Sequence, residues 1–436
     1  MGVPSGIPRE SFTQRRRRFC EEIGEGIALI PGAHLRIRSN DTEHPFRQSS
    51  DLVYLTGFEH PDALCVLSQE RFILFVQPRD PAAETWTGLR PGVEGAVERY
   101  GADEAHPIEE LERRLPDLLA GRSRLFHRFG SDAELDRIVH SALRALGARI
   151  RQGVLAPYEF IDPGHVLHEM RLRKDAEELR IMRAAAEISR EAHHAAARLC
   201  APGRHEYELE AELFRVFRGR GGAGPAYSSI VGSGEHATIL HYIENSGPLR
   251  DGELVLIDAG VELHGYASDV TRTYPVSGRF RGAAREVYQA VLRAQLASIG
   301  SIAPGVTLAE LHRVAVRSLS EDLIAMGALE GDLDEVIESE RYRRFYMHGT
   351  GHFLGLDVHD VGAYRIDGKP RPLEPGMVFT SEPGLYLSAR EESTPEEFRG
   401  IGVRIEDDIV VTEDGFEILT HDIPKAIDDV EAWMRD

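Results

Sequence analysis

Residues 248–260, PLRDGELVLIDAG, align without a gap on residues 372–384, PLEPGMVFTSEPG. The alignment places Asp258 on Glu382. Each of these acidic residues follows a mostly apolar run of the kind that predicts a short buried strand. The repeat therefore predicts two equivalent strands that carry acidic residues at equivalent ends.

A second internal match lies upstream of each copy. Residues 201–209, APGRHEYEL, and residues 303–311, APGVTLAEL, share Ala-Pro-Gly followed at the same offset by Glu-Leu, and both open a helical stretch. These copies predict a duplicated unit of helices plus a hairpin, because a solenoid would need several copies of a shorter period. We expect two halves that face each other across a central cleft.

The length of the chain predicts two domains, because a single core rarely extends over 436 residues. Residues 1–170 alternate short apolar runs with helical stretches, which is an α/β pattern. Residues 171–436 form the second domain. Its order of elements is α+β, with helices packed on an antiparallel sheet.

Three local patterns in the second domain predict particular elements. The charged run at residues 171–178 predicts the start of a long helix that reaches Leu199. Residues 402–411 predict one strand, whose alternation directs Arg404 and Glu406 to the same side. The Glu-Asp-Gly sequence after this strand predicts a hairpin turn.

The composition indicates a globular protein and excludes two classes of partner. The chain is 42% hydrophobic and has a formal net charge of −21. Nucleic acids and anionic membranes attract clustered Lys and Arg, so neither is an expected partner. The one basic run, residues 15–18, is followed at once by acidic residues, and we interpret it as a solvated helix face.

Cysteine usage and the N-terminal sequence predict a cytoplasmic protein. Cys20, Cys65 and Cys200 are widely spaced and form no CxxC pair, so neither a disulfide framework nor a thiolate metal site is indicated. The first residues lack the apolar segment of a signal peptide. No stretch approaches the roughly 18 apolar residues of a membrane span.

Acidic residues and histidines of the second domain predict a metal site. The candidates are Asp258, Asp269, Glu382, Glu406, His348, His352 and His359. Taken singly, an Asp at a strand end is usually a turn former, a histidine among apolar residues is usually a hydrogen-bonded core residue, and Glu406 fits an exposed edge strand. Four converging carboxylates, however, would repel one another unless cations neutralised them. Two divalent ions would balance the four charges.

The types of ligand narrow the choice of metal and the chemistry. Carboxylate oxygens and an imidazole suit Mn²⁺, Co²⁺, Zn²⁺ or Fe²⁺ rather than Cu(I). Between two such ions a bridging water ionises near neutral pH and can attack a carbonyl. The chain contains neither the HExxH motif of one-zinc peptidases nor the G-x-S-x-G motif of serine hydrolases. We therefore expect a metal-bound hydroxide as the nucleophile.

These residues lie in segments that resemble the pita-bread metallopeptidases. The matching segments are His241-Tyr242, 256–260 (LIDAG), 268–273 (SDVTRT), 347–349 (MHG) with His352, 358–360 (VHD), 381–386 (SEPGLY) and 403–408 (VRIEDD). Within that group the chain is most similar to the Xaa-Pro aminopeptidases, also called aminopeptidase P. The resemblance covers nearly the whole chain and implies an α/β N-terminal domain followed by a pita-bread catalytic domain.

The resemblance also implies a ligand set for two divalent ions. It assigns Asp258 to one ion, Asp269 and Glu406 to bridging positions, and His352 with Glu382 to the other ion. Mn²⁺ is the favoured metal, with Co²⁺ or Zn²⁺ as alternatives. Glu382 would in addition help to move the proton of the bridging hydroxide.

Five further residues match positions that act on the substrate in this family. His241, His348 and His359 resemble the histidines that contact substrate and handle protons. Arg404 and Tyr386 would orient the ligands and the oxyanion. Together with Glu382, the three histidines and Arg404 form the expected catalytic set.

The implied substrates are peptides with proline in the second position. A bond before proline resists ordinary aminopeptidases, because its nitrogen lacks a hydrogen and the ring fixes φ. The resemblance implies a proline pocket floored by the histidines. Trp86, from the N-terminal domain or a neighbouring subunit, is a candidate wall, although a lone tryptophan is more often a packing residue. Family members often form homodimers or homotetramers, which we expect here.

Several alternatives share parts of this pattern. Prolidase, which accepts only Xaa-Pro dipeptides, has the same ligands, but the short segment between His359 and Gly376 and the sequence IDGKPRPL at residues 366–373 favour the aminopeptidase. Methionine aminopeptidase would lack the first 170 residues. Creatinase and the pita-bread proteins that serve as binding modules work without metal or have lost ligands, and the intact ligand set argues against both.

Overall fold

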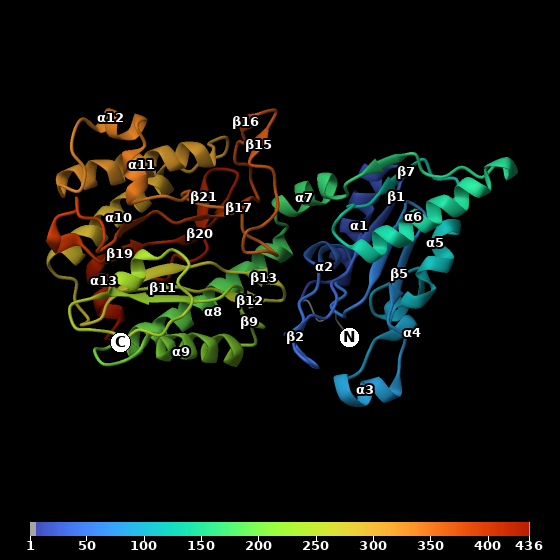
Figure 1. Ribbon diagram of the computed structural model, residues 1–436, viewed down its shortest axis with the longest axis horizontal. Coiled ribbons are helices and arrows are strands. Elements are labelled where there is room, and N and C mark those ends of the chain that lie inside the picture. The colour runs from blue at the N-terminus through green and yellow to red at the C-terminus, as the bar shows by residue number, and fades with distance from the viewer. Residues whose placement is uncertain (1–5, 436) are drawn as a thin grey trace. The chain divides into compact units, whose positions relative to one another are not determined.

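The computed structural model describes residues 6–435 and is shown in Figure 1. The chain divides into two compact units, Met1–Arg171 and Leu172–Asp436. Among the described residues, no helix is both long and apolar enough to cross a membrane.

The first unit contains a six-stranded mixed sheet in the order β6-β5-β4-β1-β7-β8. The central strand β1 pairs antiparallel with β4 and parallel with β7. The sheet strands are β1 (Ile27–Pro31), β4 (Leu64–Leu67), β5 (Phe72–Val76), β6 (Glu104–Pro107), β7 (Arg124–Phe126) and β8 (Glu159–Ile161). A separate hairpin consists of β2 (Ile37–Ser39) and β3 (Thr42–Glu43).

Helices alternate with these strands along the chain, which confirms the α/β prediction. The helices are α1 (Arg9–Ile23), α2 (Ser50–Thr56), α3 (Pro81–Thr87), α4 (Gly92–Glu98), α5 (Leu111–Leu119), α6 (Ala133–Ala148) and α7 (Gly164–Leu172). The core forms where Leu115 of α5 and Val139 of α6 pack with Leu29, Val66 and Phe75 of the strands. These five side chains are at most 1% exposed, so α5 and α6 bury one face of the sheet.

Two arginines of the basic run are buried, which corrects the expectation of a solvated helix face. The Arg15 guanidinium lies 4.4 Å from the ring centroid of Tyr54, and that of Arg16 lies 4.1 Å from the ring of Phe72. Arg16 also donates to the carbonyl of Leu55 at 2.9 Å. A guanidinium can be buried when aromatic rings and carbonyls replace its water. The other two arginines of the run are exposed.

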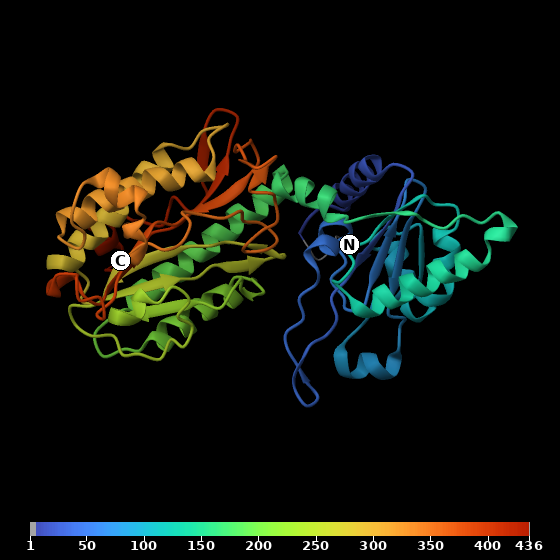
Figure 2. The same ribbon diagram turned by 45° about the horizontal axis from the view of Figure 1, so that its top comes forward.

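The second unit consists of two halves, each with two long helices outside and strands inside. Figure 2 shows α8 and α9 (green) on one side of the strands and α10 and α11 (yellow to orange) on the other. The first half contains α8 (Ala176–Leu199), α9 (Glu206–Gly219), β9 (Gly224–Pro225), β10 (Ile230–Ser233), β11 (Leu254–Asp258), β12 (Val261–Leu263), β13 (Tyr266–Ala267) and β14 (Thr271–Pro275).

The second half repeats this order with additional short elements. It contains α10 (Gly282–Gly300), α11 (Leu308–Ala325), α12 (Leu333–Glu338), β15 (Arg365–Ile366), β16 (Lys369–Pro370), β17 (Val378–Ser381), β18 (Gly384–Leu387), β19 (Ile401–Arg404), β20 (Asp407–Val411), β21 (Phe416–Ile418) and α13 (Ile427–Trp433). β11 pairs antiparallel with β14, and β17 pairs antiparallel with β20. The predicted hairpin between β20 and β21 is confirmed.

The two halves make the same backbone contacts at the repeated sequences. The amide of Gly203 donates to the carbonyl of Leu249 at 3.0 Å, and the amide of Gly305 donates to that of Leu373 at 2.8 Å. Each contact joins the start of a long helix to the residues that lead into β11 or β17. The internal repeat is therefore a repeat of structure as well as of sequence.

Two predicted elements are interrupted in the structure. The long helix begins at Ala176 and not within residues 171–175, because the Asp175 side chain caps it by accepting from the amides of Glu177 and Glu178 at 2.9 Å each. The predicted strand at residues 402–411 is two strands, β19 and β20, which pair with different partners. At the break, the amide of Glu406 donates to the carbonyl of Thr271 at 3.0 Å.

Candidate metal centre and active site

A cavity of about 570 Å³ in the second unit brings the predicted ligands and catalytic residues together. These residues all line it: Asp258, Asp269, His352, Glu382, Glu406, His241, His348, His359 and Arg404. Apolar side chains complete the wall, among them Ile230, Leu240, Ile243 and Val358. The cavity thus combines a charged group with apolar surface, as small-molecule sites usually do.

Strand ends hold the four carboxylates. Asp258 is the last residue of β11 and lies opposite Thr271, the first residue of β14. Asp269 lies just before β14, Glu382 just after β17, and Glu406 between β19 and β20. Because β11 and β14 are antiparallel, the end of β11 lies beside the start of β14, which brings Asp258 and Asp269 to the same end of the strand pair.

Two glycines allow the backbone segments of the site to approach closely. A Cβ atom at Gly260 would overlap the carbonyl of Ser268, and one at Gly351 would overlap the carbonyl of Thr380. The second approach lets the carbonyl of His352 accept from the amide of Thr380 at 2.9 Å. Glycine is required at both positions because any side chain would separate these segments.

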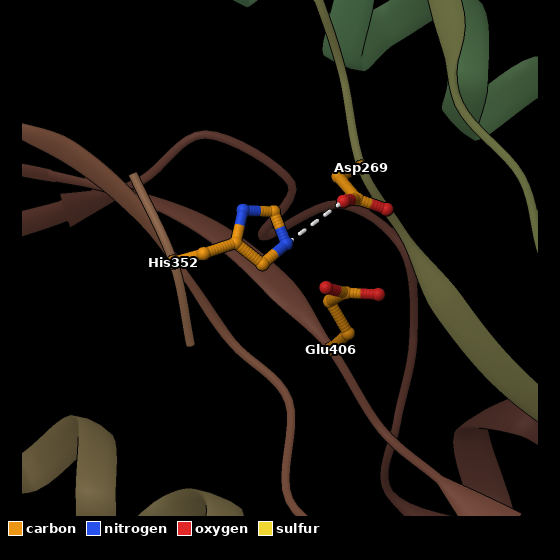
Figure 3. A group of neighbouring side chains, drawn as sticks. All are labelled: Asp269, His352 and Glu406. Atoms are coloured by element: carbon orange, nitrogen blue, oxygen red, sulfur yellow. Dashed lines mark ion pairs between the residues drawn. The ribbon is translucent and has the colours of Figure 1, made fainter. Parts of the chain in front are cut away.

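Asp269, His352 and Glu406 point toward one another (Figure 3), and their ligand atoms lie within 4.8 Å of one another. His352 Nε2 is 3.3 Å from Asp269 Oδ2 and 3.8 Å from Glu382 Oε1. The Thr271 hydroxyl donates to Glu406 Oε2 at 2.6 Å and so fixes that carboxylate. One imidazole nitrogen and several carboxylate oxygens at this spacing fit a divalent transition metal.

Burial and mutual repulsion disfavour ionised carboxylates here. Burial raises the pKa of Glu382 to about 7 and that of Glu406 well above its usual range, with repulsion from Asp269 adding to both. Burial also raises the pKa of Asp258, although Arg404 opposes the shift. Such clustered buried charge is what bound cations would neutralise.

The surroundings of His352, the predicted histidine ligand, favour its charged form, whereas those of the carboxylates favour the neutral form. Burial lowers the pKa of His352, but its contacts with Asp269 and Glu382 outweigh burial and raise the pKa to about 9. Its Nδ1 lies 3.1 Å from the carbonyl of Phe353, which fixes the ring so that Nε2 faces the carboxylates.

Arg404 connects the predicted ligand Asp258 to Tyr386. Its guanidinium donates to Asp258 Oδ2 at 2.6 Å, to the Tyr386 hydroxyl at 2.9 Å and to the Thr271 hydroxyl at 3.0 Å. The side chain of Arg404 is 4% exposed. Because Thr271 in turn donates to Glu406, one guanidinium orients carboxylates from both halves of the unit.

His348 is held as a neutral imidazole. Burial, and then the charge of Arg404, lower its pKa to about 3. Its Nδ1 lies 2.7 Å from the carbonyl of Gly349, which can only accept, so Nδ1 carries the proton. Its Nε2 therefore accepts from the Tyr386 hydroxyl at 2.8 Å. Arg404, Tyr386 and His348 thus form a directed chain of hydrogen bonds.

His359 and His241 also face the cavity, whereas Trp86 belongs to the other unit. The ring of His359 lies edge-on to that of His352, with centroids 4.4 Å apart, and burial lowers the pKa of His359. Trp86 is in α3 of the first unit, where it is 89% exposed. Its expected place beside the proline pocket stays a prediction.

Sequence reasoning missed Tyr227, which touches two of the carboxylates. Its hydroxyl lies 2.6 Å from Asp258 Oδ1 and 2.5 Å from Asp269 Oδ1. Burial and the two carboxylates raise the pKa of Tyr227 well above its usual value, so the phenol stays protonated. Asp408, also missed, accepts from the amide of Asp269 at 3.1 Å. Tyr227 lies outside every matching segment, whereas Asp408 ends the segment 403–408, which did not distinguish it from its neighbours.

Comparison with known proteins identifies the family of the chain. Residues 180–413 match the model of metallopeptidase family M24, and residues 12–126 match that of the aminopeptidase P N-terminal domain. The Xaa-Pro aminopeptidase of Escherichia coli K12 is 46% identical over 436 residues, covering 99% of this chain and 98% of that protein. That of Haemophilus influenzae is 42% identical, covering 98% of each.

Solved structures show the same similarity. Aminopeptidase PepP of Pseudomonas aeruginosa superposes with a TM-score of 0.96 at 46% identity, covering 98% of each chain. Zinc-substituted aminopeptidase P of Escherichia coli in complex with product gives the same TM-score, identity and coverage. The prediction of an α/β domain followed by a pita-bread catalytic domain is confirmed. The chain belongs to metallopeptidase family M24 and, within it, to the Xaa-Pro aminopeptidases.

Proposed function

We propose that this enzyme releases the first residue from peptides whose second residue is proline. The observation that carries the proposal is the convergence of all predicted ligands and catalytic side chains in one cavity. The apolar side chains of Ile230, Leu240 and Val358 offer surface for a proline ring. The named activity of the relatives supports the same substrate class, and it disfavours prolidase.

We further propose that five side chains hold two divalent ions. These are Asp258, Asp269, His352, Glu382 and Glu406, and Mn²⁺ suits their hard oxygen donors best, with Co²⁺ or Zn²⁺ as alternatives. The spacing of the Asp269, His352 and Glu406 ligand atoms fits such ions. When bound, the ions polarise the scissile carbonyl and lower the pKa of a water molecule.

The other side chains would bind the peptide and move protons. Glu382, which lies 3.6 Å from His348 Nδ1, would accept a proton from the attacking water and return it to the departing proline nitrogen. Tyr386, which accepts from Arg404 and donates to His348, would help to orient the groups around the developing oxyanion. His241 and His359 would contact the substrate from the cavity wall.

The test uses metal-stripped enzyme with and without added Mn²⁺, Co²⁺ or Zn²⁺. An Arg-Pro-Pro tripeptide, an Arg-Ala-Pro tripeptide and an Arg-Pro dipeptide would be compared by the release of arginine. We expect metal-dependent cleavage of Arg-Pro-Pro and little cleavage of Arg-Ala-Pro. Cleavage of the dipeptide alone would assign prolidase activity, and no cleavage with any metal would favour a binding module.

We also propose a cytoplasmic homodimer or homotetramer. The three cysteines are buried free thiols, which suits a reducing compartment. Light scattering of the purified protein would measure the mass of the assembly. A monomer over the working concentration range would contradict the oligomer.

A further inference from the structure

Glu206, the first residue of α9, is a buried carboxylate that fastens the loop carrying His241. Its Oε1 accepts from the amide and the hydroxyl of Ser233 at 2.7 and 2.9 Å. Its Oε2 accepts from the amide of Gly247 at 2.6 Å and from the hydroxyl of Tyr242 at 2.9 Å. These bonds hold both ends and the middle of a loop whose regular structure is limited to one short 3₁₀ turn, Gly234–Thr238.

The attachment reaches the cavity through Tyr242. Leu240, His241 and Ile243 line the cavity, whereas Tyr242, between them, is buried and bonds to Glu206. The position of Tyr242 therefore sets the direction in which the adjacent histidine leaves the backbone.

A second attachment of the same kind holds the segment that carries His359. Asp360, the next residue, accepts from Lys174 Nζ at 2.9 Å, and both side chains are 1% exposed. The amide of Asp360 donates to the carbonyl of Phe353 at 2.8 Å. A Cβ at Gly355 would overlap the Asp360 carboxylate, so this glycine makes room for the ion pair.

We propose that Glu206 and Lys174 are positioning residues, which act through Tyr242 and Asp360 to aim His241 and His359 at the peptide. The inference rests on the proposed function. Glu206 and Lys174 do not line the cavity, so they would act through these neighbours.

The internal repeat allows the position of Glu206 to be compared with the equivalent position in the second half of the unit. In the repeat Glu206 corresponds to Leu308, which begins α11, so the helix pair does not require a carboxylate at this place. Buried charge-assisted bonds are strong and directional, which suits a part that must hold a loop in one geometry. A displacement of about 1 Å at a reacting group can lower the rate about 100-fold.

Double-mutant cycles test the proposal on the metal-loaded full chain. Glu206→Gln and Lys174→Met would each be combined with His241→Ala and with His359→Ala, and kcat/KM measured on Arg-Pro-Pro. We expect Glu206→Gln to lower kcat/KM roughly 10-fold alone and beside His359→Ala, but to add nothing beside His241→Ala. Lys174→Met should lower kcat/KM alone and beside His241→Ala, but should add nothing beside His359→Ala. Equal losses in both backgrounds, or no loss at all, would overturn the proposal.

Glu178→Gln is the matched control for Glu206→Gln. Glu178 is also buried and accepts from a tyrosine hydroxyl, that of Tyr266, at 2.9 Å, but Tyr266 does not adjoin a residue of the cavity. This variant should keep kcat/KM within about 2-fold of the wild type, because the energetic coupling of distant sites is small. A loss as large as that of Glu206→Gln would assign the effect to general loosening of the helices.

Hydrogen exchange of the metal-free protein gives a readout that needs no activity. Glu206→Gln should speed exchange in residues 239–247 and leave residues 356–362 unchanged, and Lys174→Met should do the reverse. Faster exchange throughout the protein would contradict the positioning role. Because this measurement does not depend on peptidase activity, it can fail independently of the proposed function. If Lys174→Met does not fold, Asp360→Asn removes the negative charge of the same ion pair with a smaller change in the side chain.

Discussion

The guanidinium of Arg404 donates to Oδ2 of Asp258 at 2.6 Å, and this ion pair joins the two halves of the catalytic unit. Arg404 ends β19 in the second half, and Asp258 ends β11 in the first. The pair is buried, with side-chain exposures of 4% and 11%. A buried pair of this kind is costly to break, because the remaining charge is left without a partner.

Replacing Arg404 by Lys is expected to lower kcat about 10- to 100-fold while bound metal stays near the wild-type level. Lysine keeps the charge, but it cannot reach Asp258, Tyr386 and Thr271 at once as the guanidinium does. Metal analysis and kcat on Arg-Pro-Pro would measure both quantities. Arg183→Lys, which changes an exposed pair, is the control. A wild-type kcat in the Arg404 variant would contradict the role of the guanidinium in orienting these three groups.

Replacing Asp269 by Ala is expected to abolish peptidase activity and bound metal together. Asp269 Oδ2 faces His352, and its loss would remove a shared ligand from the middle of the site. Metal analysis by mass spectrometry and the tripeptide assay would check the result. Asp414→Ala, in the exposed hairpin turn, should match the wild type. An active Asp269→Ala enzyme would rule out the two-metal mechanism.

Removing metal is expected to lower the melting temperature. The site then holds several buried carboxylates without their counter-charges. Restoring Mn²⁺ to about 100 times its Kd should stabilise the protein by about 2.7 kcal/mol. For a unit of this size that corresponds to a rise of about 5 to 10 °C. Differential scanning fluorimetry would measure it, and a metal-independent melting temperature would contradict the proposed ligand set.

His193 is expected to make stability fall in mild acid. It is fully buried, with Nε2 2.9 Å from the carbonyl of Ala259, and burial lowers its pKa from 6.5 to about 4. The unfolded chain therefore binds a proton that the folded chain does not. The contribution is complete above pH 6.5 and is lost as the pH falls toward 4, by on the order of 3 kcal/mol.

Urea unfolding at pH 4.5, 5.5 and 7.0 would test this for the wild type and for His193→Gln. The variant should show a flatter dependence of the free energy of unfolding on pH, because glutamine does not titrate in this range. The same slope in both proteins would assign acid sensitivity to other groups.

Local patterns in the sequence were sufficient for the framework of the site. The repeat that aligns Asp258 with Glu382 predicted two equivalent strand ends. This was possible because the pattern that marks a strand depends only on residues that are close in the sequence. The chemical types of Asp269, His352 and Glu406 predicted a divalent-metal site, because the side chains that bind such metals can be recognised from the sequence alone. The motifs around them also identified the family, which the comparisons confirm.

Only the tertiary structure decided which groups complete the site and hold it in place. Tyr227 contacts Asp258 across 31 residues of chain, and Lys174 pairs with Asp360 across 186, so no local pattern could predict either contact. The break between β19 and β20 has the same origin, since the amide at residue 406 bonds to a strand of the other half. Arg15, which the sequence predicted to be solvated, is buried because an aromatic ring from a segment remote in the sequence covers it. Sequence thus determines the elements and their chemistry, whereas contacts between remote segments determine the geometry.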